Sequence, residues 1–314
     1  MARARGGRTL LAGAFETVEK TPPSSGYVLL PNRSNNLGVQ NDLIDDDIVG
    51  DRDPGDADLD VPNADGTIKV PLDLNAIGFW LKALLGDPQS SVVDSVYTHV
   101  FQSGSWALPT MALERQMPDA ASFEMFVGCK ANRLRYALQR GGRVNASVEV
   151  MAQGAQAPAP ATAAGTPASF DLQRFMQAQG QVTVDGSGPG DIVECSIDYT
   201  NNLDAVDSVT ADGFIGGLDE MRAALTGNLR LRFSSETLFA TAKANTPVAL
   251  SLVHTISASA KLTLAMPRVF LSVPKKPIEG PQGVEASFSW QAARADNGDP
   301  MLTATLINAV ENYE

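Results

Sequence analysis

The densest group of side chains capable of chemistry is the stretch SNNLGVQNDLIDDDIVGDRDPGDADLD, Ser34 to Asp60. It holds nine aspartates and one arginine. Such carboxylates can ligate a cation, take part in acid–base catalysis, interact with a charged partner, or be merely solvated. The helix–loop–helix calcium motif needs glycine at its sixth position and glutamate at its twelfth, but counting from Asp56 gives Val61 and Thr67. Cation binding by the loop from Asp42 to Asp65 is left open, and a solvated or partner-facing loop is favoured.

Residues that commonly act as nucleophiles, bases or metal ligands are few. Both histidines, His99 and His254, lie in apolar, strand-like stretches and are predicted to be structural and hydrogen-bonded. The two cysteines, Cys129 and Cys195, are too few for a disulfide framework or a four-cysteine zinc site, and we expect buried free thiols. The glycine-rich DGSGPGD (Asp185 to Asp191) lacks the lysine and helix of a phosphate loop, and no serine forms a nucleophile elbow. We therefore predict no enzyme activity, no catalytic, cofactor-binding or metal-site residues, and no cofactor.

A basic run, KANRLRYALQRGGR (Lys130 to Arg143), carries five positive charges. If it is a strand, Arg133 and Arg135 share one face, because side chains alternate across a sheet. A nucleic-acid-binding face is one interpretation, but Tyr136 is the one aromatic residue interleaved with these charges. The net charge of −12 also argues against tight DNA binding, which needs basic patches to replace counterions. A solvated face, or one that contacts another subunit, is favoured.

Alternation of apolar and polar residues predicts a mainly β fold. The clearest segments are 67–74, 143–150, 228–233, 260–266, 284–290 and 301–310. Helical spacing is found from Asn75 to Gly86, with Asn75 as N-cap and Ile77, Leu81, Leu84 and Leu85 on one face, and from Ser234 to Asn245, with a serine cap. No apolar run approaches the roughly 20 residues of a membrane span, so we expect synthesis in the cytoplasm and no membrane contact.

An Ala/Pro/Gly-rich segment, 152–169, contains no aromatic or large aliphatic residue and is predicted to be a linker between residues 1–151 and 170–314. Short matches relate the two halves in the same order. They are SNNLGV (34) with TNNLDAV (200), IVGD (48) with FIGG (214), GTIKVPL (66) with GNLRLRF (227), and VNAS (144) with VEAS (284). We interpret them as a tandem duplication. The second copy has far fewer aspartates in the corresponding loop, so these carboxylates are not needed for folding.

The second half, from GNLRLRF through LFATAKANTPVALSL and IEGPQGVEASFSWQA to MLTATLINAV, resembles the major tail tube proteins of long, non-contractile-tailed (siphovirus-like) bacteriophages. LPNRSNNLG, GTIKVPLDLNAIGFWLKALLG and GCKANRLRYAL in the first half resemble the same family. The resemblance implies a structural protein of the virion tail. Its two tandem tube-type β-sandwich or barrel units, each with a short helix, would assemble through their sheets into a closed ring. Stacked rings would form a tube whose lumen conducts genomic DNA during ejection.

The resemblance also implies partners: further copies of the chain, the tape measure, terminator and distal tail proteins, and DNA that passes without specific binding. Single-unit members of the family build rings of six, so two units in one chain imply a homotrimer with pseudo-sixfold symmetry. Six chains, each with one half outside the ring wall, are the alternative. We expect Asp45, Asp46 and Asp47 to face the lumen or the next ring, where they would repel DNA or meet Arg133, Arg135, Arg140 and Arg143 of a neighbour.

A rival from another class is a β-sandwich that binds a small ligand or a carbohydrate. Such a protein would be a monomer with one pocket rimmed by aromatic residues. Aromatic residues make up 6% of this chain, and Trp80, Trp106 and Trp290 lie far apart in the sequence.

Overall fold

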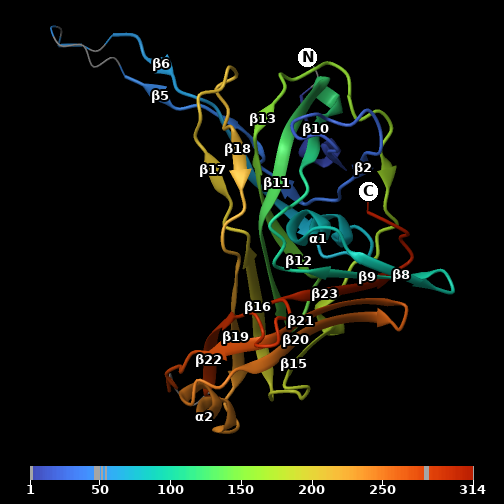
Figure 1. Ribbon diagram of the computed structural model, residues 1–314, viewed down its shortest axis with the longest axis vertical. Helices are drawn as coiled ribbons and strands as arrows, with labels where there is room; N and C mark the ends of the chain where they lie inside the picture. Colours follow the sequence, from blue (N-terminus) through green and yellow to red (C-terminus); the bar gives the residue numbers. More distant parts are fainter. Residues whose placement is uncertain (1–2, 46–49, 51, 54, 279–282, 314) are drawn as a thin grey trace.

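The computed structural model describes residues 3–45, 50, 52–53, 55–278 and 283–313 (Figure 1). Strands account for 49% of the chain, and the strands do not close into a barrel. The predicted mainly β class is therefore confirmed, and a barrel is not.

In the first half the strands are β1 (Leu10–Phe15), β2 (Val28–Leu29), β3 (Ser34–Asn35), β4 (Gly38–Gln40), β5 (Leu43–Ile44), β6 (Asp58–Leu59), β7 (Asn63–Pro71), β8 (Gln89–Val93), β9 (Val96–Gln102), β10 (Met111–Met117), β11 (Ser122–Gln139), β12 (Asn145–Ala152) and β13 (Gly154–Ala155).

The remaining strands are β14 (Ala168–Ser169), β15 (Gly180–Val184), β16 (Ile192–Thr200), β17 (Asp204–Val206), β18 (Gly217–Asp219), β19 (Ala224–Arg232), β20 (Val248–Ser257), β21 (Ala260–Leu271), β22 (Glu285–Ala292) and β23 (Thr303–Asn308). The helices are α1 (Ile77–Leu85), α2 (Thr237–Lys243) and the 3-10 helices η1 (Gly6–Arg8), η2 (Pro118–Ala120) and η3 (Gln177–Gln179). All six predicted strand segments and both predicted helices are present.

The 18-residue strand β11 joins the two ends of the molecule (Figure 1). Its first part pairs with β10 and β13, in a sheet that continues through β1 and β2 to β14. Its second part pairs with β12 on one edge and β16 on the other. A long antiparallel sheet therefore runs in the order β7, β12, β11, β16, β19, β22, with β3 and β4 outside β7. The two halves of the chain thus share one continuous sheet.

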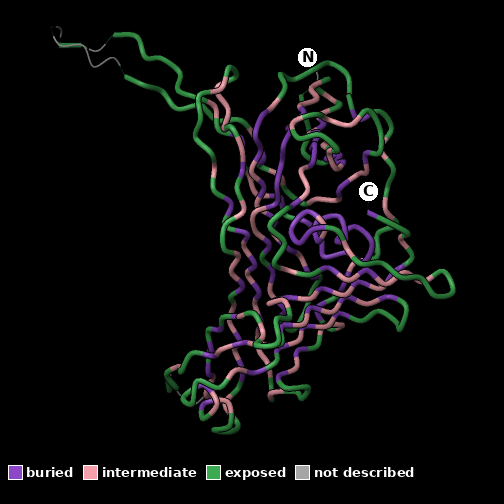
Figure 2. Tube along the Cα trace, in the orientation of Figure 1, coloured by how far each residue is buried: buried purple, intermediate pink, exposed green. Residues whose placement is uncertain are grey.

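Helix α1 is buried on nearly all sides and packs against the apolar face of this sheet (Figure 2). Gly78 is required because a Cβ at this position would lie 2.0 Å from the ring of Tyr313. Asn75 is not the N-cap that the sequence predicted. Its side chain donates to the carbonyl of Asp171 instead, and Asp73 Oδ1 accepts the amides of Asn75 and Ala76 at 2.9 and 3.0 Å. The helix ends as predicted at Gly86, whose φ is 94°.

Segment 152–169, the predicted linker, is mostly exposed but is attached to the sheet at both of its ends. Its strand β13 pairs with β11, and β14 pairs in parallel with β2. Ala164 is 6% exposed, and its amide donates to Glu114 at 2.7 Å. Small side chains allow this segment to lie close against the sheet, where backbone hydrogen bonds compensate for the absence of large apolar groups.

Strand registers recur between the halves. In β7–β12, Val70 lies opposite Ala146, and in β19–β22 Leu231 lies opposite Ala286. These are the separations of 161 and 140 positions that the GTIKVPL and VNAS matches predicted. The SNNLGV match is wrong in register. Gln40 pairs with Asn63 as Thr200 pairs with Ala224, so the structural separation of these first strands is 160 positions instead of 166. The IVGD match falls partly outside the described residues.

Candidate functional face

The long sheet has one apolar face and one polar face. Buried residues such as Ile68, Val148 and Leu229 point toward the core. Every second residue points the other way, because strand side chains alternate. These outward residues are Thr67 and Lys69 on β7, Asn145, Ser147 and Glu149 on β12, Arg133, Arg135 and Gln139 on β11, Glu194, Ser196, Asp198 and Thr200 on β16, Thr226, Asn228, Arg230 and Arg232 on β19, and Glu285, Ser287, Ser289 and Gln291 on β22. We call this set the polar face.

Most positive charges on the polar face are matched by carboxylates on neighbouring strands. Arg133 donates to Asp198 across the β11–β16 pair at 2.7 Å, and this hydrogen bond raises the pKa of the guanidinium. Arg135 pairs with Glu149. Arg230 lies between Glu194 and Glu285 at 3.0 and 3.2 Å. Arg133 and Arg135 share a face as predicted, but both are engaged by acids of their own chain. A guanidinium already paired with a carboxylate is a poor phosphate ligand, so this face has the character of a wall rather than of a nucleic-acid-binding site.

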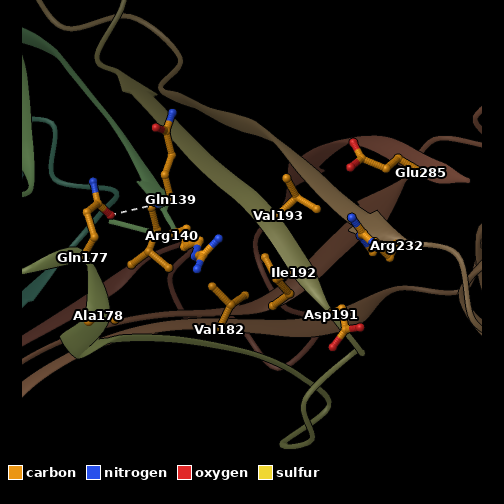
Figure 3. A pocket seen from close by; sticks show the side chains of 12 residues that line it. Gln139, Arg140, Gln177, Ala178, Val182, Asp191, Ile192, Val193, Arg232 and Glu285 are labelled. Carbon is orange, nitrogen blue, oxygen red and sulfur yellow. Dashed lines mark hydrogen bonds between the residues drawn. The ribbon is translucent and has the colours of Figure 1, made fainter. Parts of the chain in front are cut away.

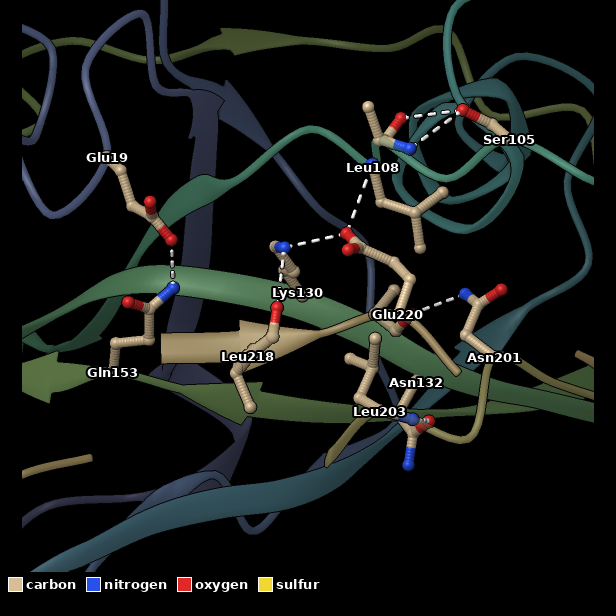
Figure 4. A network of polar contacts seen from close by, with 12 residues as sticks. Glu19, Ser105, Leu108, Lys130, Asn132, Gln153, Asn201, Leu203, Leu218 and Glu220 are labelled. Carbon is tan, nitrogen blue, oxygen red and sulfur yellow. Dashed lines mark hydrogen bonds and ion pairs between the residues drawn. The ribbon is translucent and has the colours of Figure 1, made fainter. Parts of the chain in front are cut away.

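A second polar network anchors the hairpin β17–β18 to β11 (Figure 4). Lys130 is 7% exposed, and its ammonium donates to Glu220 at 2.7 Å and to the carbonyl of Leu218 at 2.8 Å. Glu220 also accepts the amide of Leu108. Burial acts to raise the pKa of Glu220, but the hydrogen bonds from Lys130 and the backbone outweigh it, and the pKa is lowered. No sequence pattern indicated this pair, because its members lie 90 positions apart.

The aspartate-rich loop extends from the body as a hairpin arm built on β5 and β6 (Figures 1 and 2). Asp42, Asp45, Asp53, Asp56, Asp58 and Asp60 are exposed on it. Asp46 and Asp47 lie outside the described residues. Within the described part of the chain, no group of three or more His, Cys, Asp or Glu side chains is placed to hold a metal ion. Exposed apolar residues accompany the acids on the arm, with Leu43 68% and Leu59 72% exposed.

Arg140 and Arg143 follow the end of β11, at the end of the long sheet away from this arm. Arg140 lines an open cavity of about 700 Å³ together with Gln177 and Val182 near β15 and Asp191 and Arg232 beside β16 (Figure 3). Arg143 is exposed. Within one chain, therefore, the four arginines are not brought together, and two of them are already paired.

The histidines and cysteines are structural. His99 is hydrogen-bonded through both ring nitrogens, to Ser90 Oγ at 2.7 Å and the carbonyl of Val310 at 2.8 Å, as predicted. His254 is buried against the rings of Tyr136 and Phe175, but no partner for its nitrogens occurs among the described residues, contrary to prediction. Burial lowers the pKa of His254 to about 4, so the ring is neutral near pH 7. Cys129 and Cys195 are buried free thiols, and burial raises the pKa of both.

The tryptophans do not form a common pocket. Trp80 and Trp290 are buried in the core at 1% and 3% exposure, whereas Trp106 is 73% exposed on a loop. Trp106 lines a shallow groove of about 740 Å³ with Tyr199 and Met301. Within the described residues, therefore, Trp106 borders this groove, whereas Trp80 and Trp290 are enclosed in the core.

The family profile described as phage tail tube protein matches residues 6–292. The match covers most of the chain and both halves of the long sheet. This chain belongs to the phage tail tube protein family. Comparison with curated proteins gives no significant match. As a tail tube protein the chain is a structural component of a virion, in a family that is typically not enzymatic. No helix in the described part of the chain is long and apolar enough to cross a bilayer.

Proposed function

We propose that this tail tube protein forms closed rings of three chains, which stack into a siphovirus-type tail tube, and that its polar face lines the lumen through which DNA leaves the virion. The observation that carries the proposal is the polar face itself. It spans six strands contributed by both halves, and the opposite side of the same strands is covered by the core. Of the two faces of this sheet, the polar face is the one free to border a water-filled channel.

The charges of the polar face suit a conduit. Arg133, Arg135 and Arg230 are paired with carboxylates, so few cations remain to hold a phosphate backbone. The chain as a whole is acidic, at −12, and repels DNA within roughly 8 Å, the Debye length at physiological salt. A passing duplex would therefore meet a hydrated wall with little adhesion.

Three chains per ring are supported by the recurrent strand registers. Residues 1–151 and 170–314 each contain a strand pair in the same register, with a short helix directly after the first strand of the pair. We interpret them as two tube-type units, with 152–169 as the connection between them. Three such chains present six units, and synthesising two units as one chain makes their encounter intramolecular. The neighbours in the tail would be the tape measure, terminator and distal tail proteins.

Native mass spectrometry and electron microscopy of purified assemblies test this function. We expect rings or tubes whose repeating ring has three times the chain mass of 33.2 kDa. A map should place Lys69, Arg135 and Thr226 on the lumen wall. A persistent monomer at high concentration would contradict the proposal. A ring of six chains with one half on the outside would contradict its stoichiometry.

A further inference from the structure

The junction between the two halves is a complete strand-to-strand interface. Arg133 to Gln139 of β11 pair antiparallel with Thr200 to Glu194 of β16. Beyond the pair, Asn201 Nδ2 donates to the carbonyl of Ala131 at 3.0 Å, and the amide of Leu203 donates to Asn132 Oδ1 at 3.0 Å. Tyr199 and Leu203 are 4% and 9% exposed.

In the first half, β3 and β4 correspond to β16, one side of this interface. Their outer edge has no strand partner within the described chain. Because Gln40 pairs with Asn63 as Thr200 pairs with Ala224, residues 39, 41 and 43 correspond to residues 199, 201 and 203. Asn41 and Leu43 are even the same residue types as Asn201 and Leu203. Yet Val39 is 38% and Leu43 is 68% exposed, since within the described chain β4 pairs with β7 alone.

In the second half, β21 and the residues after it correspond to β11, the other side of the interface. The part that corresponds to Arg133–Leu138 also has no strand partner within the described chain. Lys130 and Ala131 pair with Met151 and Val150, and 140 positions later Phe270 and Leu271 pair with Gln291 and Trp290. Val273–Ile278 therefore corresponds to Arg133–Leu138. It forms no strand, and Ile278 is 81% exposed where Leu138 is 7% exposed.

Two contacts support this correspondence. Lys276, the counterpart of buried Tyr136, already faces helix α2, with its ammonium 4.0 Å from the Phe239 ring. The adjoining edge of β22 borders a cavity of about 790 Å³ lined by Pro274 and Lys275, whereas in the first half β11 covers the corresponding edge of β12. The segment lies beside the edge that it would complete.

We propose that Val273–Ile278 of one copy adds as a strand to the edge of β3–β4 in a second copy, with Val273 opposite Gln40 and Ile278 opposite Asn35. Leu271 and Ser272 accept hydrogen bonds from Asn41 and Leu43 of that copy, as Ala131 and Asn132 accept them from Asn201 and Leu203. This inference rests on the proposed ring and identifies the contact that closes it. The contact is heterologous and repeats the internal junction, so it can continue around a ring.

In the free chain, both the segment Val273–Ile278 and the edge of β3–β4 carry features that oppose pairing with other strands. Lys275 and Lys276 are charged, and Pro274 and Pro277 lack amide hydrogens, which are features that discourage unwanted pairing of edge strands. The two prolines also leave the docked strand with fewer ladder hydrogen bonds than Arg133–Leu138 makes. On the receiving edge, Arg115 donates to the carbonyl of Leu37 at 2.6 Å, and Asn35 Oδ1 accepts the amide of Leu37 at 2.8 Å. Docking exchanges these side-chain contacts for a strand, so the segment becomes ordered on assembly.

Disulfide trapping in assembled tubes tests the register. Opposed residues of antiparallel strands lie within disulfide range, so Val273→Cys with Gln40→Cys should link neighbouring chains on mild oxidation. In a three-chain ring the ladder on a non-reducing gel should end at the trimer. Arg133→Cys with Thr200→Cys is the matched control and should close within one chain, because these residues are directly paired. The native Cys129 and Cys195 are buried and should not interfere.

A slipped pair, Val273→Cys with Asn36→Cys, should remain unlinked. Tubes in which the control closes but Val273→Cys and Gln40→Cys do not link would overturn the contact while leaving the tube function intact. Efficient linking at Asn36 would overturn the register. If wild-type protein forms no rings or tubes, the proposed function fails, and this inference fails with it.

Hydrogen exchange of the unmodified protein gives a second measurement that needs no variant. Peptides covering Ser272–Ile278 should exchange fast in the free chain and slowly in tubes, whereas those covering Arg133–Leu138 should be slow in both. Equal exchange of the first segment in free chain and tubes would contradict ordering on assembly.

Discussion

The hairpins β17–β18 and β5–β6 follow strands of the two halves that pair in the same register, but the surroundings of the two hairpins differ. Asp204 lies opposite Asp219 in one, as Ile44 lies opposite Asp58 in the other. The first is held against β11 by Lys130, Glu220 and the buried Leu203, whereas the second extends freely with Leu43 exposed. The contrast shows that β17–β18 is fixed by its contacts with β11. If the proposed ring forms, we expect a neighbouring copy to supply comparable contacts to β5–β6.

The largest effect is expected at the ion pair that fixes β17–β18. Lys130→Met leaves the largely enclosed carboxylate of Glu220 without its cation. Because 14% of the Glu220 side chain remains exposed, we expect a loss of about 3 kcal/mol, at the lower end for breaking a buried pair. Chemical denaturation should show this loss in the free energy of unfolding. The matched control is Arg268→Met, which removes the pairing of Arg268 with the exposed Asp296 and should cost less than about 1 kcal/mol. Similar losses in the two variants would show that the Lys130 pair does not anchor the hairpin.

A smaller effect separates the two equivalent leucines. Leu203→Ala removes buried apolar atoms and should lower the free energy of unfolding of the monomer by about 2–3 kcal/mol. Leu43→Ala should leave the monomer's stability within about 0.5 kcal/mol of wild type, because the side chain is exposed. It should nevertheless weaken ring assembly, measured by sedimentation, whereas Val93→Ala, equally exposed on β8, should not. Normal assembly of Leu43→Ala would contradict the expectation that exposed Leu43 takes part in a contact between copies.

The sequence predicted the elements better than their partners. Strands β7, β12, β19 and β22 were recognisable because apolar and polar residues alternate along each of them, and α1 because its apolar spacing ends at Gly86. The ion pair of Arg133 with Asp198 spans 65 positions, so it depends on which strands become neighbours. Similarly, SNNL and QNDL both resemble TNNL, and strand pairing is needed to identify QNDL as its counterpart.

Asn75 illustrates the same limit on a smaller scale. It occupies the expected capping position, but tertiary packing turns its side chain toward Asp171, and Asp73 accepts the nearby amides. Local propensity therefore located the start of the helix to within two residues and assigned the cap to the wrong side chain. Nothing in the local sequence indicates that Asp171 would lie nearby.

Acid should loosen the hairpin β17–β18 from β11, so that it becomes more mobile. The pKa of Glu220 in the fold lies below its ordinary value of 4.5. A carboxyl with a lowered pKa contributes its full stabilisation above the ordinary value and loses it as the pH falls through the folded value. Amide exchange in β17–β18, corrected for its intrinsic pH dependence, should therefore rise selectively below about pH 4.5. Glu220→Gln should abolish this pH dependence, and an unchanged profile in that variant would assign the transition to another group.

The smallest effect on stability is expected on the free arm, from the triple change Asp45→Asn, Asp46→Asn and Asp47→Asn. Asp45 is exposed, and surface substitutions away from special contacts usually change stability by less than about 0.5 kcal/mol. Thermal denaturation of the monomer should therefore be unchanged. Each exposed charge contributes at most about 1 kcal/mol to a contact, but a stacked tube repeats the contact in every ring, so small differences accumulate. We expect altered tube length in assembly assays or altered DNA release from particles. Unfolding of the variant, or wild-type assembly together with wild-type release, would show that the carboxylates of the arm serve solvation alone.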